Sequence, residues 1–249
     1  MLRRLSLLLV GLFAVAACHA DPNATSASTA ASTAAASLPA AAPASASAPA
    51  RDWQLGADYF LIDPRVPTTT GDKIEVVEAF SYACPHCAHF VPSIDELKAK
   101  LPANAQLVLL PVVFRPEWEP FARAFYTAKS MGVLDKTHAA LFNALHNEHL
   151  PLNTLDLLAT AFYANHGVNP QSFIATASSF VVDSQLARGN QLVREYGVNS
   201  TPTLIVNGKY RIELSTERNI GAKEAVELAL FLVNQESAQV KIGAVKPAQ

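Results

Sequence analysis

Two cysteines separated by two residues constrain this chain more than any other feature. Cys84 and Cys87 enclose Pro85 and His86, and the apolar run Ile74–Phe80 comes shortly before them. A helix-compatible pattern follows, so the cysteines are predicted where a strand ends and a helix begins. At that position the unpaired backbone N–H groups and the positive end of the helix dipole favour a thiolate over a thiol.

The spacing predicts different chemistry for the two sulfurs. Pro85 at the first helical position loses no hydrogen bond, and a protonated His86 adds positive charge beside Cys84. Cys87 falls one turn into the helix, where it is better shielded. We therefore expect Cys84 to be the attacking or attacked sulfur and Cys87 to resolve the mixed disulfide.

A metal site is the alternative interpretation of the same residues. Cys84, His86, Cys87 and His89 place four possible ligands within six residues. Structural zinc usually needs a second ligand pair at a recognisable spacing, and the sequence has no second CxxC and no HxxxH. Redox use of the cysteines is therefore favoured over metal binding.

The N-terminal residues predict export and a lipid anchor. Arg3 and Arg4 precede an apolar run over residues 5–17, which is too short for a membrane span and typical of a secretory signal. Residues 15–18, Val-Ala-Ala-Cys, resemble the lipobox of bacterial lipoproteins. Residues 1–17 are thus expected to be removed, leaving Cys18 as a palmitate-bearing N-terminus held in a membrane. The alternative is an ordinary signal peptide that removes Cys18 or leaves it free.

The export prediction also sets the compartment, because an exported CxxC works in an oxidising environment. His19 follows Cys18 where inner-membrane lipoproteins carry an aspartate, so the outer membrane is favoured. Residues 18–50 are the expected linker: from residue 24 onward they are Ala, Ser, Thr and Pro except Leu38, and they offer no apolar face to bury. With 19 basic and 21 acidic residues in the chain, no basic excess indicates nucleic acid as a partner.

The pattern after the linker begins as an α/β unit, predicted to span residues 51–114. Three apolar runs are expected to form strands: residues 58–62, Ile74–Phe80 and residues 107–114. Between the last two, a helix after Cys84 is interrupted by Pro92, and strand-helix-strand order implies a parallel pair. Glu78 shares one strand face with apolar residues that lead toward the cysteines. Alternatively, Glu78 reaches water or Lys73.

Residues 115–189 carry helical patterns alone and predict an inserted helical domain. Asp135 and Asn169 are expected helix caps there. Without HExxH or another ligand spacing, the histidines of this stretch are interpreted as solvated helix residues: His138, His146, His149 and His166. Residues 190–237 complete the α/β unit with a hairpin signal at Asn207-Gly208 and a helix over residues 219–237, before a tail at 238–249.

Taken together, these motifs resemble the DsbA thiol:disulfide oxidoreductases of the bacterial periplasm. The resemblance covers about residues 58–237 and is carried by four segments: residues 78–87, residues 179–182, Thr201-Pro202 and residues 206–210. It implies an α/β thioredoxin fold with an inserted helical domain. It further implies that Pro202 is the family's cis-proline, that Thr201 faces Cys84, and that Glu78 is a buried acid assisting proton movement at Cys87.

The family also implies the activity and the partners. The expected reaction donates the Cys84–Cys87 disulfide to reduced, unfolded exported proteins, needs no cofactor, and is followed by re-oxidation by a quinone-linked membrane protein of the DsbB type. Thr201 replaces the valine that is common in the DsbA family and is more like the disulfide isomerases. A disulfide isomerase or reductase is therefore the alternative, and a periplasmic metal-binding protein is the more distant one.

Overall fold

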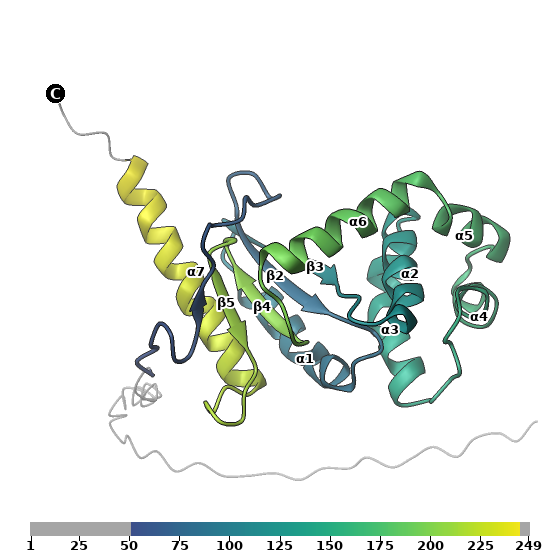
Figure 1. Cartoon of the computed structure of the whole chain (residues 1–249), viewed down its shortest axis with the longest axis horizontal. Coiled ribbons are helices and arrows are strands. Elements are labelled where there is room, and N and C mark those ends of the chain that lie inside the picture. The colour runs from purple at the N-terminus through teal and green to yellow at the C-terminus, as the bar shows by residue number, and fades with distance from the viewer. Residues whose placement is uncertain (1–50, 245–249) are drawn as a thin grey trace, which may run out of the picture. The chain divides into compact units, whose positions relative to one another are not determined.

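The computed structural model describes residues 51–244, in which a five-stranded sheet lies against helices (Figure 1). The strands are β1 (Phe60–Leu61), β2 (Ile74–Phe80), β3 (Ala105–Pro111), β4 (Thr203–Val206) and β5 (Tyr210–Glu213). Their order is β1-β5-β4-β2-β3, with β2 and β3 parallel and the other pairs antiparallel. The predicted parallel pair is thus confirmed. The signal segment, Cys18 and the linker lie outside the described residues.

Strand β3 ends earlier than the predicted limits of 107–114. Phe80, the last residue of β2, lies opposite Pro111 in the parallel register, and Val112 donates the final bond to the Phe80 carbonyl at 2.7 Å. Beyond that point β2 has turned toward its helix, so no partner strand remains. The apolar residues that follow pack as loop rather than as strand.

Helices cover both faces of the sheet. On one face lie α1 (Pro85–Lys100), which contains Pro92, and α7 (Ala222–Ala244), which begins three residues later than predicted and runs past residue 237. The other face is covered by the C-terminal half of α6 (Phe180–Glu195). Every residue of β2 is buried, as a central strand between two helical layers requires.

The predicted helical insertion between β3 and β4 is confirmed. Its elements before α6 are η1 (Pro116–Trp118), α2 (Glu119–Ser130), α3 (Leu134–His146), α4 (Leu155–Leu157), a π-helical turn η2 (Leu158–Phe162), η3 (Tyr163–His166) and α5 (Pro170–Ala177). Asn169 caps α5 by accepting from the Ser172 N–H at 2.9 Å. The prediction that Asp135 caps a helix is wrong: Val133 is the cap residue of α3, and Asp135 lies in its first turn.

Helix α6 belongs to two hydrophobic cores. Val182 and Leu186 pack among the helices of the insertion, whereas Val193 packs on the sheet. The limits of 115 and 189 for the insertion therefore stay a prediction, since one continuous helix crosses the second limit. None of the helices within residues 51–244 combines the length and the hydropathy that a membrane span needs.

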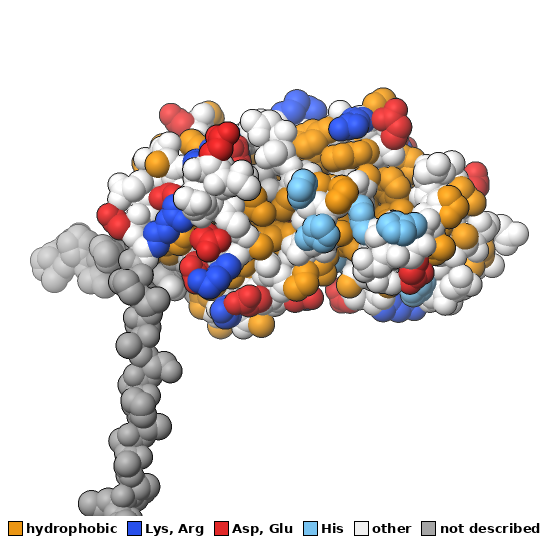
Figure 2. Space-filling model, turned by 90° about the horizontal axis from the view of Figure 1, so that it is seen from below, with side chains coloured by type: hydrophobic (Ala, Val, Ile, Leu, Met, Phe, Trp, Pro, Cys, Tyr) orange, Lys and Arg blue, Asp and Glu red, His pale blue; other side chains and the backbone are white. Residues whose placement is uncertain are grey.

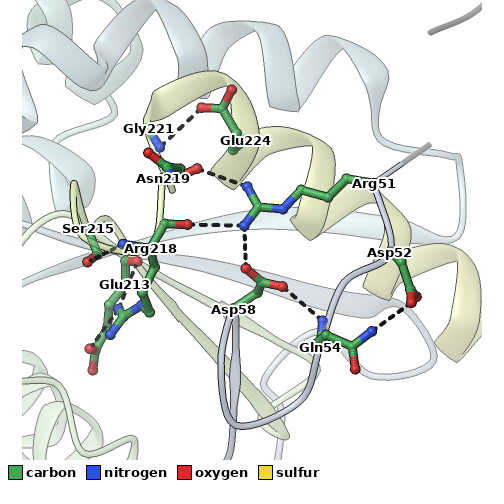
Figure 3. Close-up of polar contacts among 10 residues, drawn as sticks. All are labelled: Arg51, Asp52, Gln54, Asp58, Glu213, Ser215, Arg218, Asn219, Gly221 and Glu224. Atoms are coloured by element: carbon green, nitrogen blue, oxygen red, sulfur yellow. Dashed lines mark hydrogen bonds and ion pairs between the residues drawn. The ribbon is translucent and has the colours of Figure 1, made fainter. Parts of the chain in front are cut away.

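A polar network holds the first described residues against the sheet (Figure 3). The Arg51 guanidinium pairs with Asp58 at 2.5 Å and donates to the backbone carbonyls of Arg218 and Asn219 at 3.0 and 2.9 Å. Asp58 is buried and also accepts from the Gln54 N–H. Arg51 is therefore held beside the loop between β5 and α7.

The predicted hairpin at Asn207-Gly208 is confirmed. Both residues have positive φ, 55° and 62°, and the Lys209 N–H closes the turn on the Val206 carbonyl at 3.0 Å. The turn packs on the segment before β2, where Val66 donates to the Gly208 carbonyl at 2.9 Å. A Cβ on Gly208 would lie 2.0 Å from the Val66 carbonyl oxygen.

Gly208→Ala is expected to destabilise the protein by at least about 2 kcal/mol, because backbone strain and a backbone clash act together. Gly71→Ala is the matched control: its φ is 64°, but nothing lies within 4 Å of the added Cβ. We expect a loss of only about 1 kcal/mol there. Chemical denaturation of both variants measures the difference, and equal losses would contradict the close approach to Val66.

Candidate active site

Cys84 and Cys87 lie where β2 and its following turn meet α1, as the sequence predicts. Cys84 is the N-cap residue of α1 with extended backbone angles, and Pro85 takes the first helical position. Both cysteines are free thiols in the structure and both are buried, with exposed fractions of 6% and 0%. Pro85 and His86 are exposed between them. The first sulfur is thus near the surface and the second beneath it.

The environment of Cys84 favours its thiolate. A hydrogen bond from Cys87 lowers the pKa of Cys84 most, and bonds from Thr201 and from the backbone N–H groups of Cys87 and His86 lower it further. Burial acts in the opposite direction, and the resulting pKa is about 5. The His86 N–H is one of the donors at the start of α1 that have no partner within the helix. His86 thus acts on the sulfur through its backbone, while its imidazole is exposed.

Cys87 is shifted in the opposite direction. Its hydrogen bond to Cys84 raises the pKa of Cys87 well above its ordinary value, and burial raises it further. At neutral pH one sulfur of the pair is therefore an anion and the other keeps its proton. Such a pair can release a disulfide readily, because the reduced state is stabilised at Cys84.

Thr201 and Pro202 directly precede β4, and Thr201 contacts Cys84. The peptide bond between Thr201 and Pro202 is cis. The Cys84 sulfur lies 3.4 Å from the Thr201 carbonyl oxygen, to which it donates only when Cys84 is protonated. The residues that the resemblance assigns to the site therefore come together in the fold, although 117 positions separate them along the chain.

Glu78 lies in the middle of β2 and is almost fully buried, with 3% exposed. The alternative interpretation, in which Glu78 reaches water or Lys73, is wrong. Burial, followed by the charge of Asp95 on α1, raises the pKa of Glu78 to about 8. Within residues 51–244 no hydrogen bond or ion pair to this carboxyl is present. A charge on Glu78 in turn raises the pKa of Cys87.

The interpretation of the insertion histidines as solvated residues is wrong for His138 and His146. Both lie on α3 and bond Tyr82, which belongs to the turn before Cys84: His138 Nδ1 is 2.7 Å from the Tyr82 hydroxyl, and His146 Nε2 is 2.7 Å from the Tyr82 carbonyl oxygen. His166 is partly buried and reaches the Phe162 carbonyl. No sequence motif marks these contacts, because 56 and 64 positions separate the partners.

A groove of about 600 Å³ opens beside Pro85 between α1 and α3. Apolar side chains, three histidines and two asparagines line it: Pro85, Ala88, Val91, Pro92, Ala139, Phe142, His89, His146, His149, Asn143 and Asn147. Figure 2 shows a face of the molecule on which histidines are set among hydrophobic side chains. In residues 51–244 no three His, Cys, Asp or Glu side chains are grouped so that they could hold a metal ion.

Comparison with known proteins agrees with this geometry. The family profile described as Thioredoxin matches residues 72–223. Thiol:disulfide interchange protein DsbA of Pseudomonas aeruginosa is 39% identical over 194 residues, which cover 78% of this chain and 90% of that protein. The same-named protein of Azotobacter vinelandii is 36% identical over 189 residues, covering 76% and 87%.

Solved structures give the same result. The crystal structure of Pseudomonas aeruginosa DsbA superposes with a TM-score of 0.71 at 38% identity and covers 76% of this chain and 97% of that one. Oxidoreductase DsbA from Xylella fastidiosa gives a TM-score of 0.67 at 34% identity, covering 73% and 96%. The expected thioredoxin fold with an inserted helical domain is thereby confirmed. The chain belongs to the DsbA family of thiol:disulfide oxidoreductases.

Proposed function

We propose that this protein donates the Cys84–Cys87 disulfide to reduced, unfolded exported proteins. A client thiolate attacks the Cys84 sulfur, the Cys84–Cys87 bond breaks, and Cys87 leaves with the electron pair and takes up a proton. A second client thiolate then attacks the client sulfur of the mixed disulfide and expels Cys84 as a thiolate. The client loses two electrons and two protons; one proton stays on Cys87 and the other goes to solvent.

The opposite acidity of the two sulfurs is the observation that carries this proposal. The reduced product holds its charge on Cys84, whose pKa is about 5, so the equilibrium favours giving the disulfide away. The raised pKa of Cys87 makes that sulfur take up a proton as soon as it leaves. A pair of ordinary thiols would lack both contributions.

We assign Glu78 the role of proton carrier for Cys87. Its pKa of about 8 leaves the carboxyl able to give or accept a proton near neutral pH. The carboxyl is buried, and its charge raises the pKa of Cys87. Pro202 and Thr201 are assigned the complementary role of presenting backbone groups to an extended client segment beside Cys84.

The compartment and partners follow from the sequence and the family. We place the protein in the periplasm, tethered through a lipid on Cys18 to a membrane, for which the outer membrane is favoured. A quinone-linked protein of the DsbB type is the proposed re-oxidant. Palmitate labelling of the full chain tests the lipid.

Recognition of clients is proposed to rest on apolar contact. The groove beside Pro85 is lined by apolar side chains together with histidines and asparagines, and no acidic, lysine or arginine side chain is among its lining residues. Unfolded proteins expose apolar side chains around their cysteines, so such a surface can bind many sequences without requiring particular charged residues in the client. This agrees with the nearly balanced charge of the chain.

An isomerase or reductase remains the alternative because of Thr201. The hydroxyl of Thr201 lowers the pKa of Cys84, which by itself favours the oxidant. Thr201→Val is therefore expected to raise the Cys84 pKa by about one unit, or about 1.4 kcal/mol, and to weaken the oxidant. The equilibrium with glutathione measures this. A stronger oxidant with valine would favour the isomerase alternative, which refolding of a client with scrambled disulfides can then confirm.

The proposal predicts an acidic Cys84 in the reduced protein. The rate of alkylation by iodoacetamide follows the thiolate fraction and should reach half its maximum near pH 5. Cys87→Ala removes the hydrogen-bond donor that lowers the pKa of Cys84 most and should move this midpoint to higher pH. A midpoint near about 8.5, as in an ordinary peptide thiol, would rule out the proposed driving force.

Glu78→Gln is expected to stabilise the protein at high pH. The pKa of Glu78 rises from 4.5 to about 8 on folding, so the folded chain keeps a proton that the unfolded chain releases, and stability falls as pH rises between these values. The variant lacks this loss and should gain about 1–3 kcal/mol above pH 8, with little difference below pH 4.5. Chemical denaturation at several pH values measures it.

Glu75→Gln provides the matched control for Glu78. Glu75 is equally buried in β2, but its carboxylate accepts bonds from the Thr69 N–H at 2.8 Å and the Thr69 hydroxyl at 2.5 Å. This variant should destabilise the protein, because it breaks satisfied bonds to a charge. A gain in both variants would contradict the distinction between the two acids.

A further inference from the structure

Tyr82 is buried although it belongs to a turn. It lies between the end of β2 and Cys84, and only 1% of its surface is exposed. Its ring packs against Phe80 at 5.2 Å, His138 at 5.3 Å and Phe142 at 4.8 Å between ring centroids. The turn that carries the redox cysteine is therefore inserted, by this one side chain, into the core of the helical insertion.

Both polar ends of Tyr82 are bonded by one helix. A backbone carbonyl can only accept, so His146 donates from Nε2 to the Tyr82 oxygen at 2.7 Å. Burial, followed by the charge of Lys98, lowers the pKa of His138 to about 4, so its ring is neutral at pH 7. Its Nδ1 shares a hydrogen bond of 2.7 Å with the Tyr82 hydroxyl.

The three α3 residues that contact Tyr82 form a single stripe. His138, Phe142 and His146 are spaced by four residues and therefore lie on one face of the helix, one turn apart. Phe142 also stacks on the His146 ring at 6.2 Å. A helix holds such a stripe rigidly, so the position of Tyr82 is fixed by a regular element rather than by the loop itself.

The turn held in this way is the turn that surrounds both sulfurs. The Cys84 N–H donates to the Ser81 carbonyl at 3.1 Å, and the backbone of Ser81 bonds the Cys87 sulfur. Tyr82 lies between Ser81 and the two cysteines along the chain. A displacement of Tyr82 therefore moves Cys84 relative to Thr201 and to the backbone N–H groups at the start of α1.

We propose that His138 and His146 are positioning residues for thiol–disulfide exchange, acting through Tyr82 to hold residues 81–84 in the geometry that stabilises the Cys84 thiolate. The inference rests on the proposed function of Cys84. It gives the helical insertion a part in the chemistry: α3 does not touch the reacting sulfur, but it sets where that sulfur lies. Thiol–disulfide exchange by this chain then depends on residues far from the CPHC motif in sequence.

His146→Ala in the full chain tests the proposal. Losing one bond to the turn costs about 1 kcal/mol, so the variant should shift the equilibrium with glutathione about 3- to 10-fold toward the oxidised protein and raise the pH midpoint of Cys84 alkylation. His146→Gln can donate to the same carbonyl and should restore both values to within about twofold. Tyr82→Phe keeps the ring and the carbonyl bond and loses only the hydroxyl, so it should give a smaller shift in the same direction.

His166→Ala is the matched control. It also removes a bond between a histidine ring and a backbone carbonyl of the insertion, that of Phe162 at 2.9 Å, but it does not contact Tyr82. Stability should fall in this variant while the glutathione equilibrium and the alkylation midpoint stay at the wild-type values. A shift as large as that of His146→Ala would mean that any loosening of the insertion has the effect, and would overturn the proposal.

Two further results separate the possible failures. If His146→Ala and Tyr82→Phe lower stability but leave the equilibrium and the midpoint unchanged, the contacts are structural only and the inference is wrong. If wild-type Cys84 itself alkylates like an ordinary thiol, the proposed function fails before the variants are compared. Because Tyr82→Phe preserves packing, it decides the question even when His146→Ala does not fold.

Discussion

The hydrogen bond between the two sulfurs is the contact on which the chemistry of this molecule depends. It lowers the pKa of Cys84 and raises that of Cys87, so this one interaction makes Cys84 a thiolate while Cys87 stays a thiol. The contact exists only while the turn before α1 and the first turn of α1 keep a fixed relation. Much of the surrounding fold can be understood as the means of keeping it.

Three parts of the structure contribute to that relation. The sheet supplies β2, which ends at the turn, and β4, whose approach places Thr201 against Cys84. The helical insertion supplies the rest: Cys84 and Cys87 lie in the same hydrophobic cluster as residues of α2, α3 and η2. The redox pair is therefore buried by the insertion as much as by the thioredoxin-like sheet. The insertion therefore contributes to the redox site itself, in addition to any contribution to client binding.

The sequence predicts those features whose causes are local. β2 has its predicted limits, because seven buried residues between a turn and a CxxC allow few alternatives, and the Asn207-Gly208 turn follows from two residues that tolerate positive φ. The end of β3 was not predictable from hydropathy, since it depends on where β2 ends. The contacts of His138 and His146 with Tyr82 could not be predicted from the sequence either. Their partner is an aromatic residue that reads as ordinary core in sequence, and only the packing of the insertion brings them together.

The two buried acids of β2 differ in their hydrogen-bond partners, and this difference bears on which of them stabilises the fold and which is proposed to act in the reaction. Glu75 and Glu78 are three residues apart and so point to opposite faces of the sheet. Glu75 is bonded by the N–H and the hydroxyl of Thr69, as buried carboxylates normally are. Glu78 has no such partner within the described part of the chain, and an unpaired buried carboxyl lowers stability.

Because a charge on Glu78 raises the pKa of Cys87, the two groups do not readily carry negative charge together, and a proton that leaves one is drawn to the other. The lack of a bonding partner therefore supports the proposed role of Glu78 as the proton carrier for Cys87.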